Sequence, residues 1–267
     1  MFPFRDHNPS RGTPWVTWTL IGLNVLAFLS YAGALGDPRA AMAVFDAYAL
    51  IPAEFAAGHD RWTVLTSMFM HGGWMHIIGN MLFLWVFGDN MEDEFGHGGF
   101  LLFYLGAGAA AAAAHMLSDP GSAVPTVGAS GAIAGVMGGY LLLFPRARVD
   151  VLFVIVFIIR VVPIPAWVVL GVWFALQLLL GATTPVGGGG VAYWAHAGGF
   201  LAGALATLPL FVRRGGTAFW DRTDGHPPHP GAVYARSSVP RVPRGGGVSP
   251  RPGSPWQTRR RGAPRRR

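Results

Sequence analysis

Apolar stretches of the length that crosses a lipid bilayer recur along this 267-residue chain, and they constrain its fold more than any other feature. A transmembrane helix needs about 20 predominantly apolar residues. Only 12% of the residues are charged, whereas a soluble domain has about 25%. We therefore predict an all-α, polytopic membrane protein with a bundle of six transmembrane helices. The predicted spans are Trp15–Leu35, Trp74–Asn90, Phe100–Leu117, Ser130–Phe144, Ile164–Leu180 and Val191–Val212.

The arginine distribution predicts how this bundle is oriented. All 20 basic residues are arginine, and 13 of them lie beyond residue 212. Basic residues favour the cytoplasmic side, and six spans place both termini on one side. We therefore predict a cytoplasmic N-terminal segment (1–14), a six-helix membrane domain (15–212) and a disordered, Arg-rich cytoplasmic tail (213–267). The tail suits contact with lipid headgroups rather than nucleic acid, and the expected location is a cell membrane.

Three segments need a separate interpretation. The first span, Trp15–Leu35, is alternatively a cleaved signal peptide, because it ends in the small residues Ala32, Gly33 and Ala34. Residues 36–73 fit no span and are expected to form interfacial helices on the outer face. Val149–Val162 is apolar but too short to span, and we expect it to pack along the cytoplasmic interface.

Ser130 and His196 are polar side chains within predicted spans, where such groups are costly and mark functional sites. Ser130 opens the fourth span and His196 lies five residues into the sixth. At a rise of 1.5 Å per residue, both are about 8 Å below the outer surface of the hydrocarbon. We predict that the two side chains touch, as a nucleophile and its base must.

Glycine pairs predict a close approach of the same two spans. The fourth span has Gly131 and Gly135 at GxxxG spacing, and the sixth has Gly199 and Gly203. Such pairs let helix backbones pack closely in lipid. Taken alone, the glycines are better explained by plain helix packing, because GxxxG is common in membrane helices. The matched depth of the serine and the histidine therefore carries the catalytic hypothesis.

His76 and Asn80 lie four residues apart and therefore on one face of the second span. Both side chains can donate hydrogen bonds to an oxyanion, as can the helix start at Ser130. Hydrogen bonds that only bridge helices are the alternative. No Asp or Glu lies in the fourth or sixth span, so we expect His196 to act in a dyad without an orienting carboxylate.

These motifs together resemble the rhomboid intramembrane serine proteases over roughly residues 15–212. The matching patterns are His76-xxx-Asn80, Gly128-Ala129-Ser130-Gly131 and Ala195-His196-xx-Gly199-xxx-Gly203. The resemblance implies a rhomboid-like six-helix bundle in which Ser130 attacks the scissile carbonyl and His196 transfers the proton. It also implies that His76, Asn80 and the Ser130 N–H hold the oxyanion, while Gly128 lets the backbone bend toward the substrate.

The resemblance further implies transmembrane protein substrates that enter beside the fifth span, where Trp167, Trp173 and Phe174 are candidate gate residues. No cofactor is expected. In some relatives an aromatic residue four positions after the serine supports the histidine, and here that position is Ala134. A catalytically silent membrane-client binding protein is the main alternative function. A transporter or channel is a second alternative, but it would predict internal repeats, which we do not find.

One acidic group falls between the second and third spans. Glu92, Asp93, Glu94 and His97 lie within six residues of one another in that predicted loop. They are candidate metal ligands by residue type, but a solvated charge cluster is the commoner arrangement. We therefore predict no metal site.

Overall fold

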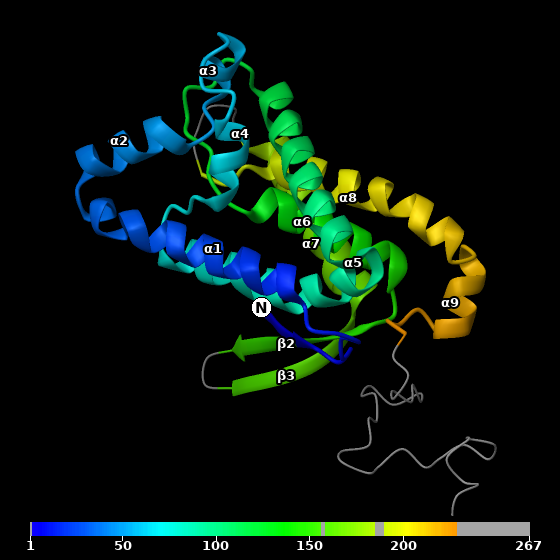
Figure 1. Cartoon of the computed structure of the whole chain (residues 1–267). Coiled ribbons are helices and arrows are strands. Elements are labelled where there is room, and N and C mark those ends of the chain that lie inside the picture. Colours follow the sequence, from blue (N-terminus) through cyan, green and yellow to red (C-terminus); the bar gives the residue numbers. More distant parts are fainter. Residues whose placement is uncertain (1, 156–157, 185–189, 229–267) are drawn as a thin grey trace, which may run out of the picture.

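The computed structural model describes residues 2–155, 158–184 and 190–228. The predicted spans correspond to long helices (Figure 1). They are α1 (Trp15–Tyr31), α5 (Trp74–Ser118), α6 (Ser130–Leu143), α7 (Ala166–Thr183) and α8 (Tyr193–Arg213). By length and composition, α1 with the 3₁₀ turn that follows it, α5, α7 and α8 can each cross a membrane, and α6 is a shorter apolar helix. The chain is therefore a polytopic membrane protein.

The 45-residue helix α5 supplies the second and third predicted spans. Its helical geometry is interrupted at Gly96, where φ is +71° and ψ is 163°. Glycine adopts positive φ without the steric penalty that a Cβ brings. The interruption separates a first half (74–95) from a second half (97–118), so the second and third predicted spans are two parts of one long helix.

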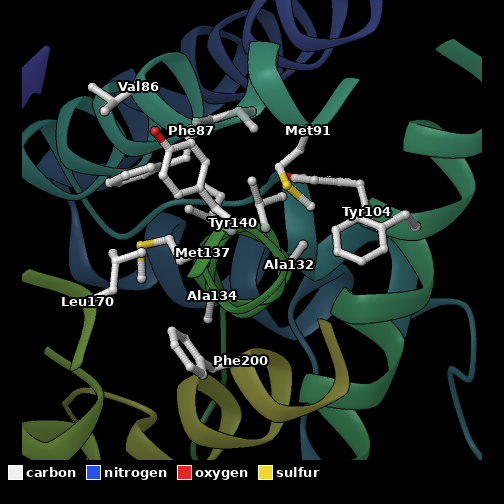
Figure 2. Close-up of a cluster of buried hydrophobic side chains, with 14 of the residues drawn as sticks. Val86, Phe87, Met91, Tyr104, Ala132, Ala134, Met137, Tyr140, Leu170 and Phe200 are labelled. Carbon is white, nitrogen blue, oxygen red and sulfur yellow. The ribbon is translucent and has the colours of Figure 1, made fainter. Parts of the chain in front are cut away.

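Helix α6 lies at the centre of the bundle. Eleven of its 14 residues are buried, and side chains from four other spans surround it. Figure 2 shows Phe87 and Tyr104 from the two halves of α5, Leu170 from α7 and Phe200 from α8 around α6. A helix that is almost wholly apolar suits this central position.

The contact between α6 and α8 is made at the backbone, as the glycine pairs predict. A Cβ added to Gly199 would lie 2.1 Å from the carbonyl oxygen of Gly131. A Cβ added to Gly203 would lie 2.0 Å from the carbonyl oxygen of Gly135. No real side chain tolerates such distances, so these glycines permit the close approach of the two helices. We call this contact the glycine seam.

Between α1 and α5 the chain forms three short helices, as predicted for residues 36–73. They are α2 (Pro38–Tyr48), α3 (Pro52–Ala56) and α4 (Thr63–Thr66). The bridge between Leu50 and Thr126 ties this region to the loop that precedes α6. We call the side of the bundle formed by α2–α4 and residues 119–129 the loop end.

The opposite side carries a three-stranded antiparallel sheet that the sequence analysis did not predict. Its strands are β1 (Phe2–Asp6), β2 (Arg148–Ile155) and β3 (Ile158–Pro165), in the order β1-β2-β3. The segment Val149–Val162, expected to lie along an interface, is therefore mostly a hairpin. Its many β-branched residues favour strands, and pairing satisfies backbone groups that an extended apolar segment would leave open. We call this side the sheet end.

The predicted tail begins with ordered structure, which corrects its expected boundary. After α8, helix α9 (Thr217–Thr223) packs against the sheet end, and the Trp220 indole donates to the carbonyl of Leu142 at 3.0 Å. Arg146 and Asp224 form an ion pair at 2.7 Å. Buried aromatic contacts hold these residues, whereas composition alone suggested disorder. Residues 229–267 of the predicted tail lie outside the described residues.

Glu92 and Glu94, near the end of the first half of α5, are buried, which corrects the expectation of a solvated cluster. Glu92 accepts hydrogen bonds from the N–H groups of Val16 and Thr17, at 2.9 and 2.8 Å, and so caps the first turn of α1. Its neighbour Glu94 pairs with Arg11 at 3.0 Å and with Arg214 at 2.7 Å. The partners are distant in sequence, and only the fold brings them to these carboxylates.

Candidate active site

A cavity of about 560 Å³ opens between the spans at the loop end. This volume lies within the range of small-molecule and cofactor sites in proteins. Residues from α5, α6, α7 and α8 contribute to its wall. Its lining includes His76, Asn80, Ser130, Trp173, Tyr193 and His196. The polar residues singled out from the sequence therefore share one cavity.

Ser130 and His196 are in hydrogen-bond contact, as their matched depth predicts. Ser130 is the first residue of α6, and His196 lies in the first turn of α8. The Ser130 Oγ atom is 2.7 Å from Nε2 of His196. The glycine seam between these helices sets the separation of their backbones, and two short side chains then bridge the remaining gap.

The other ring nitrogen of His196 has a partner that the sequence analysis did not identify. Nδ1 of His196 lies 2.8 Å from Oε1 of Gln177, which belongs to α7. The Trp173 ring, one turn earlier on α7, lies 5.7 Å from the imidazole at an interplanar angle of 34°. Ala134 provides no aromatic ring beside His196, and in this structure Trp173 of α7 provides one instead.

His76 has a defined tautomer. Its Nδ1 atom accepts a hydrogen bond from the N–H of Gly72 at 3.3 Å. A neutral imidazole has one donor and one acceptor nitrogen, so the proton is on Nε2. A Cβ added to Gly128 would lie 2.9 Å from this Nε2 atom and 3.4 Å from Ser130 Oγ. The His76 donor therefore faces the small space beside the serine hydroxyl.

Gly128 keeps that space open. Its φ is +133°, a value that residues with a Cβ rarely adopt. Its N–H donates to the carbonyl oxygen of Ser67 at 2.9 Å, which anchors the loop before α6. The first N–H groups of α6, beginning at Ser130, have no acceptor within the helix. An anion beside Ser130 would meet these N–H groups and the positive end of the helix dipole.

Asn80 lies on the cavity wall, but one of its amide hydrogens is engaged within its own helix. Its Nδ2 atom donates to the carbonyl oxygen of His76 at 2.9 Å. The structure therefore brings four of the five predicted site residues, Ser130, His196, His76 and Gly128, around one point. Asn80 is a neighbour of this group and stabilises the turn that carries His76.

His71 lies just before α5 and is fully buried. Its ring packs edge-on against His76, with centroids 5.1 Å apart. Burial, with a smaller contribution from the nearby His76, lowers the pKa of His71 from 6.5 to about 4. The residue is therefore a neutral packing element beside the cavity at physiological pH.

The predicted gate residues on α7 differ in exposure. Trp167 is 58% exposed on the outside of the bundle. Phe174 stacks on Phe200 of α8 at 4.5 Å and an angle of 18°. Only Trp173 of the three lines the cavity. Among the described residues, no group of three His, Cys, Asp or Glu is arranged to hold a metal ion.

Comparison with known proteins gives a consistent family. The family model for the Rhomboid domain matches residues 58–213, which is more than half of the chain. The chain is similar to the Rhomboid protease GluP of Bacillus subtilis, with 34% identity over 131 residues covering 49% of this chain and 25% of that protein. It is also similar to Rhomboid protein 1, mitochondrial, of Saccharomyces cerevisiae, with 28% identity covering 71% of this chain and 51% of that protein.

A third relative, RHOMBOID-like protein 4 of Arabidopsis thaliana, is 35% identical over 158 residues, which cover 58% of this chain and 36% of the relative. The chain thus spans between a quarter and a half of the length of these three relatives. The residues matched by the family model, 58–213, include α5, α6, α7 and α8, which line the cavity.

Proposed function

The chain belongs to the rhomboid family, and from this membership we propose that it is an intramembrane serine endopeptidase that cleaves transmembrane segments of other membrane proteins. The observation that carries the proposal is the 2.7 Å contact between Ser130 Oγ and His196 Nε2 in a cavity at the loop end. The relative from Bacillus subtilis is named a protease, and this name supports the proposed chemistry. The relative from Saccharomyces cerevisiae is named as mitochondrial.

In the proposed reaction, His196 Nε2 takes the hydroxyl proton as Ser130 Oγ bonds to the scissile carbonyl carbon. The carbonyl oxygen becomes an oxyanion in the space beside Gly128, where Nε2–H of His76 and the N–H groups at the start of α6 can donate to it. His196 then protonates the departing amine as the C–N bond breaks. A water molecule, activated by the same imidazole, releases the acyl group from Ser130.

We place the sheet end on the cytoplasmic side of a bacterial plasma membrane. The arginines support this orientation. Arg5 lies in β1, and Arg11, Arg146 and Arg214 form ion pairs at the sheet end, where α9 also lies. The loop end has Arg39 in α2 and Arg61 between α3 and α4. With this orientation, the chain consists of a membrane domain (15–212) followed by a cytoplasmic extension. Since the chain has no cysteine, single cysteines introduced at positions 61 and 146 should be labelled from opposite sides of sealed vesicles.

A membrane-client binding protein of the same fold is the second candidate, because family membership does not require catalysis. Such a protein has no need for a hydroxyl in contact with an imidazole. Client capture without cutting would favour this alternative. The membrane-spanning helices of the chain support membrane proteins and lipids as partners in either case.

The test uses purified protein in detergent with a model transmembrane substrate. We expect Ser130→Ala and His196→Ala to lower cleavage by at least ~10³-fold, because each removes a member of the reacting pair. Ser30→Ala and His59→Ala are matched controls at exposed positions outside the cavity, and they should cleave like the wild type. Undiminished cleavage by Ser130→Ala would overturn the proposal.

A further inference from the structure

Helix α7 carries one buried polar side chain in an otherwise apolar helix. Of its 18 residues, all of which the structure describes, only Ala166, Leu170 and Gln177 are buried. Gln177 is 8% exposed. Burying an amide is unfavourable unless it is hydrogen-bonded, so the contacts of this side chain explain why it is tolerated there.

The two ends of the Gln177 amide have different partners, and this difference fixes its orientation. Nε2 donates to the carbonyl oxygen of Trp173, one turn earlier, at 3.4 Å. Oε1 is then the atom that faces His196 Nδ1, at 2.8 Å. An amide oxygen only accepts hydrogen bonds. Nδ1 of His196 must therefore carry the ring proton, which leaves Nε2 as the acceptor facing Ser130.

This tautomer is the one that a general base requires, because Nε2 must have a free lone pair to receive the serine proton. An imidazole without a partner at Nδ1 can adopt either tautomer and can rotate about its side-chain bonds. The amide oxygen opposes both changes. It also continues to accept from Nδ1–H when the ring becomes an imidazolium during the reaction.

A neutral acceptor suits this depth in the membrane. A carboxylate would orient the imidazole more strongly, but an ionised side chain is costly within a membrane span. Glutamine supplies the acceptor oxygen without a charge. The Trp173 ring limits the space on one face of the imidazole, so two residues one turn apart on α7 restrict His196.

We propose that Gln177 is a positioning residue that holds His196 in the tautomer and orientation needed to activate Ser130. This inference rests on the proposed protease function. Simple packing of α7 against α8 is the competing explanation of the same contact. The two explanations predict opposite rankings for two substitutions, one that preserves volume and one that preserves the acceptor oxygen.

The experiment compares Gln177→Met with Gln177→Glu in detergent. Methionine fills a similar volume and is more apolar, so it should fold at least as well as the wild type, but its sulfur is a weak acceptor. We expect Gln177→Met to lower kcat about 10-fold or more with KM within twofold, as expected for loss of one orienting hydrogen bond. Leu179→Met, at a 58% exposed position on the same helix, is the matched control and should behave like the wild type.

Gln177→Glu keeps an oxygen acceptor, and we expect it to be faster than Gln177→Met. A carboxylate also stabilises the imidazolium, so the acidic limb of the pH–rate profile should move to higher pH. Labelling by a small fluorophosphonate probe should show the same order of rates, because the probe reacts with Ser130 without needing a transmembrane helix to enter. A role limited to substrate entry would leave probe labelling unchanged.

The outcomes separate this inference from the proposed function. If the wild type neither cleaves nor reacts with the probe through Ser130, the protease proposal fails. If the wild type does both and Gln177→Met matches it, only the positioning role is overturned. Should the glutamate variant not fold, as judged by thermal unfolding, the probe-labelling rate of folded Gln177→Met decides the question alone.

Discussion

The sheet end is held by charges, whereas the candidate site at the loop end is neutral. At the sheet end, the carboxylate of Glu94 lies between the guanidinium groups of Arg11 and Arg214. Near the loop end, the hydrogen-bonded series of Gln177, His196 and Ser130 contains no carboxylate and no guanidinium. Both sets are largely buried. These ion pairs join the segment before α1, the first half of α5 and the end of α8, so they hold three parts of the fold together. The site instead uses neutral groups, which can lie within a membrane span at lower cost.

The difference assigns separate tasks to the two ends. Opposite charges at the sheet end stabilise the fold, and a change there should alter stability more than the rate of reaction. Neutral hydrogen bonds at the loop end are arranged around one reactive hydroxyl, and a change there should alter rate more than stability. Substitutions at each end can therefore test this division.

The largest effect in this comparison is expected at the loop end, for His76→Ala. Removal of the Nε2–H donor beside Gly128 should lower kcat by ~10²-fold or more, because single oxyanion donors are typically worth about 3 kcal/mol. The thermal unfolding midpoint should change little. His59→Ala, which removes an exposed imidazole, serves as the control. An unchanged kcat would leave His76 with a structural role only.

The next effect is expected at the sheet end, for Glu94→Ala. Loss of the carboxylate leaves Arg11 and Arg214 without their shared partner, and we expect the free energy of unfolding to fall by about 2 kcal/mol. The effect is smaller than for a fully buried pair because both guanidinium groups are about one-third exposed. Cleavage per folded molecule should stay within twofold of the wild type.

Asp221→Ala is the control for Glu94→Ala, since it removes an exposed acid near the same end. Denaturant titration in detergent measures the change in stability, and the cleavage assay measures the rate. A Glu94→Ala protein that is fully stable but inactive would reverse the proposed division between the two ends.

The smallest effect concerns pH and His71. Its pKa is about 4 in the folded protein and about 6.5 in the unfolded chain, because burial disfavours the charged ring. Between these values the unfolded state binds more protons, so stability is present above pH 6.5 and is lost as the pH falls toward 4. In His71→Phe, the unfolding midpoint should fall less over that range. If the unfolding midpoints of the wild type and His71→Phe fall in parallel as the pH is lowered, His71 is not the group responsible for this loss of stability.

The membrane spans could be predicted from sequence because the hydrocarbon demands long apolar runs, and the starts at Trp15 and Trp74 agree with the structure. Depth along a helix could also be predicted, since it follows from counting residues. The prediction that Ser130 contacts His196 rested on that count and on the glycine pairs that lie between α6 and α8.

Features that depend on rotation about a helix axis or on distant partners were not predicted. Gln177 was visible as a polar residue late in the fifth span, but its position in sequence does not say that its amide faces His196. The environment of Glu94 required partners 83 residues before it, at Arg11, and far after it, at Arg214. The β-branched run at 149–162 was a usable signal for a hairpin, and its apolar character led us to an interfacial segment instead.

The glycine seam also restricts which sequences can descend from this one. Single-base changes in a glycine codon yield alanine, serine, valine, cysteine, tryptophan or charged residues, and each of these carries a Cβ. At Gly199 and Gly203 even that one atom would meet a carbonyl oxygen at 2.1 and 2.0 Å. Helices α6 and α8 therefore have little freedom to diverge along this line, and the seam should change more slowly over generations than the lipid-facing surface around it.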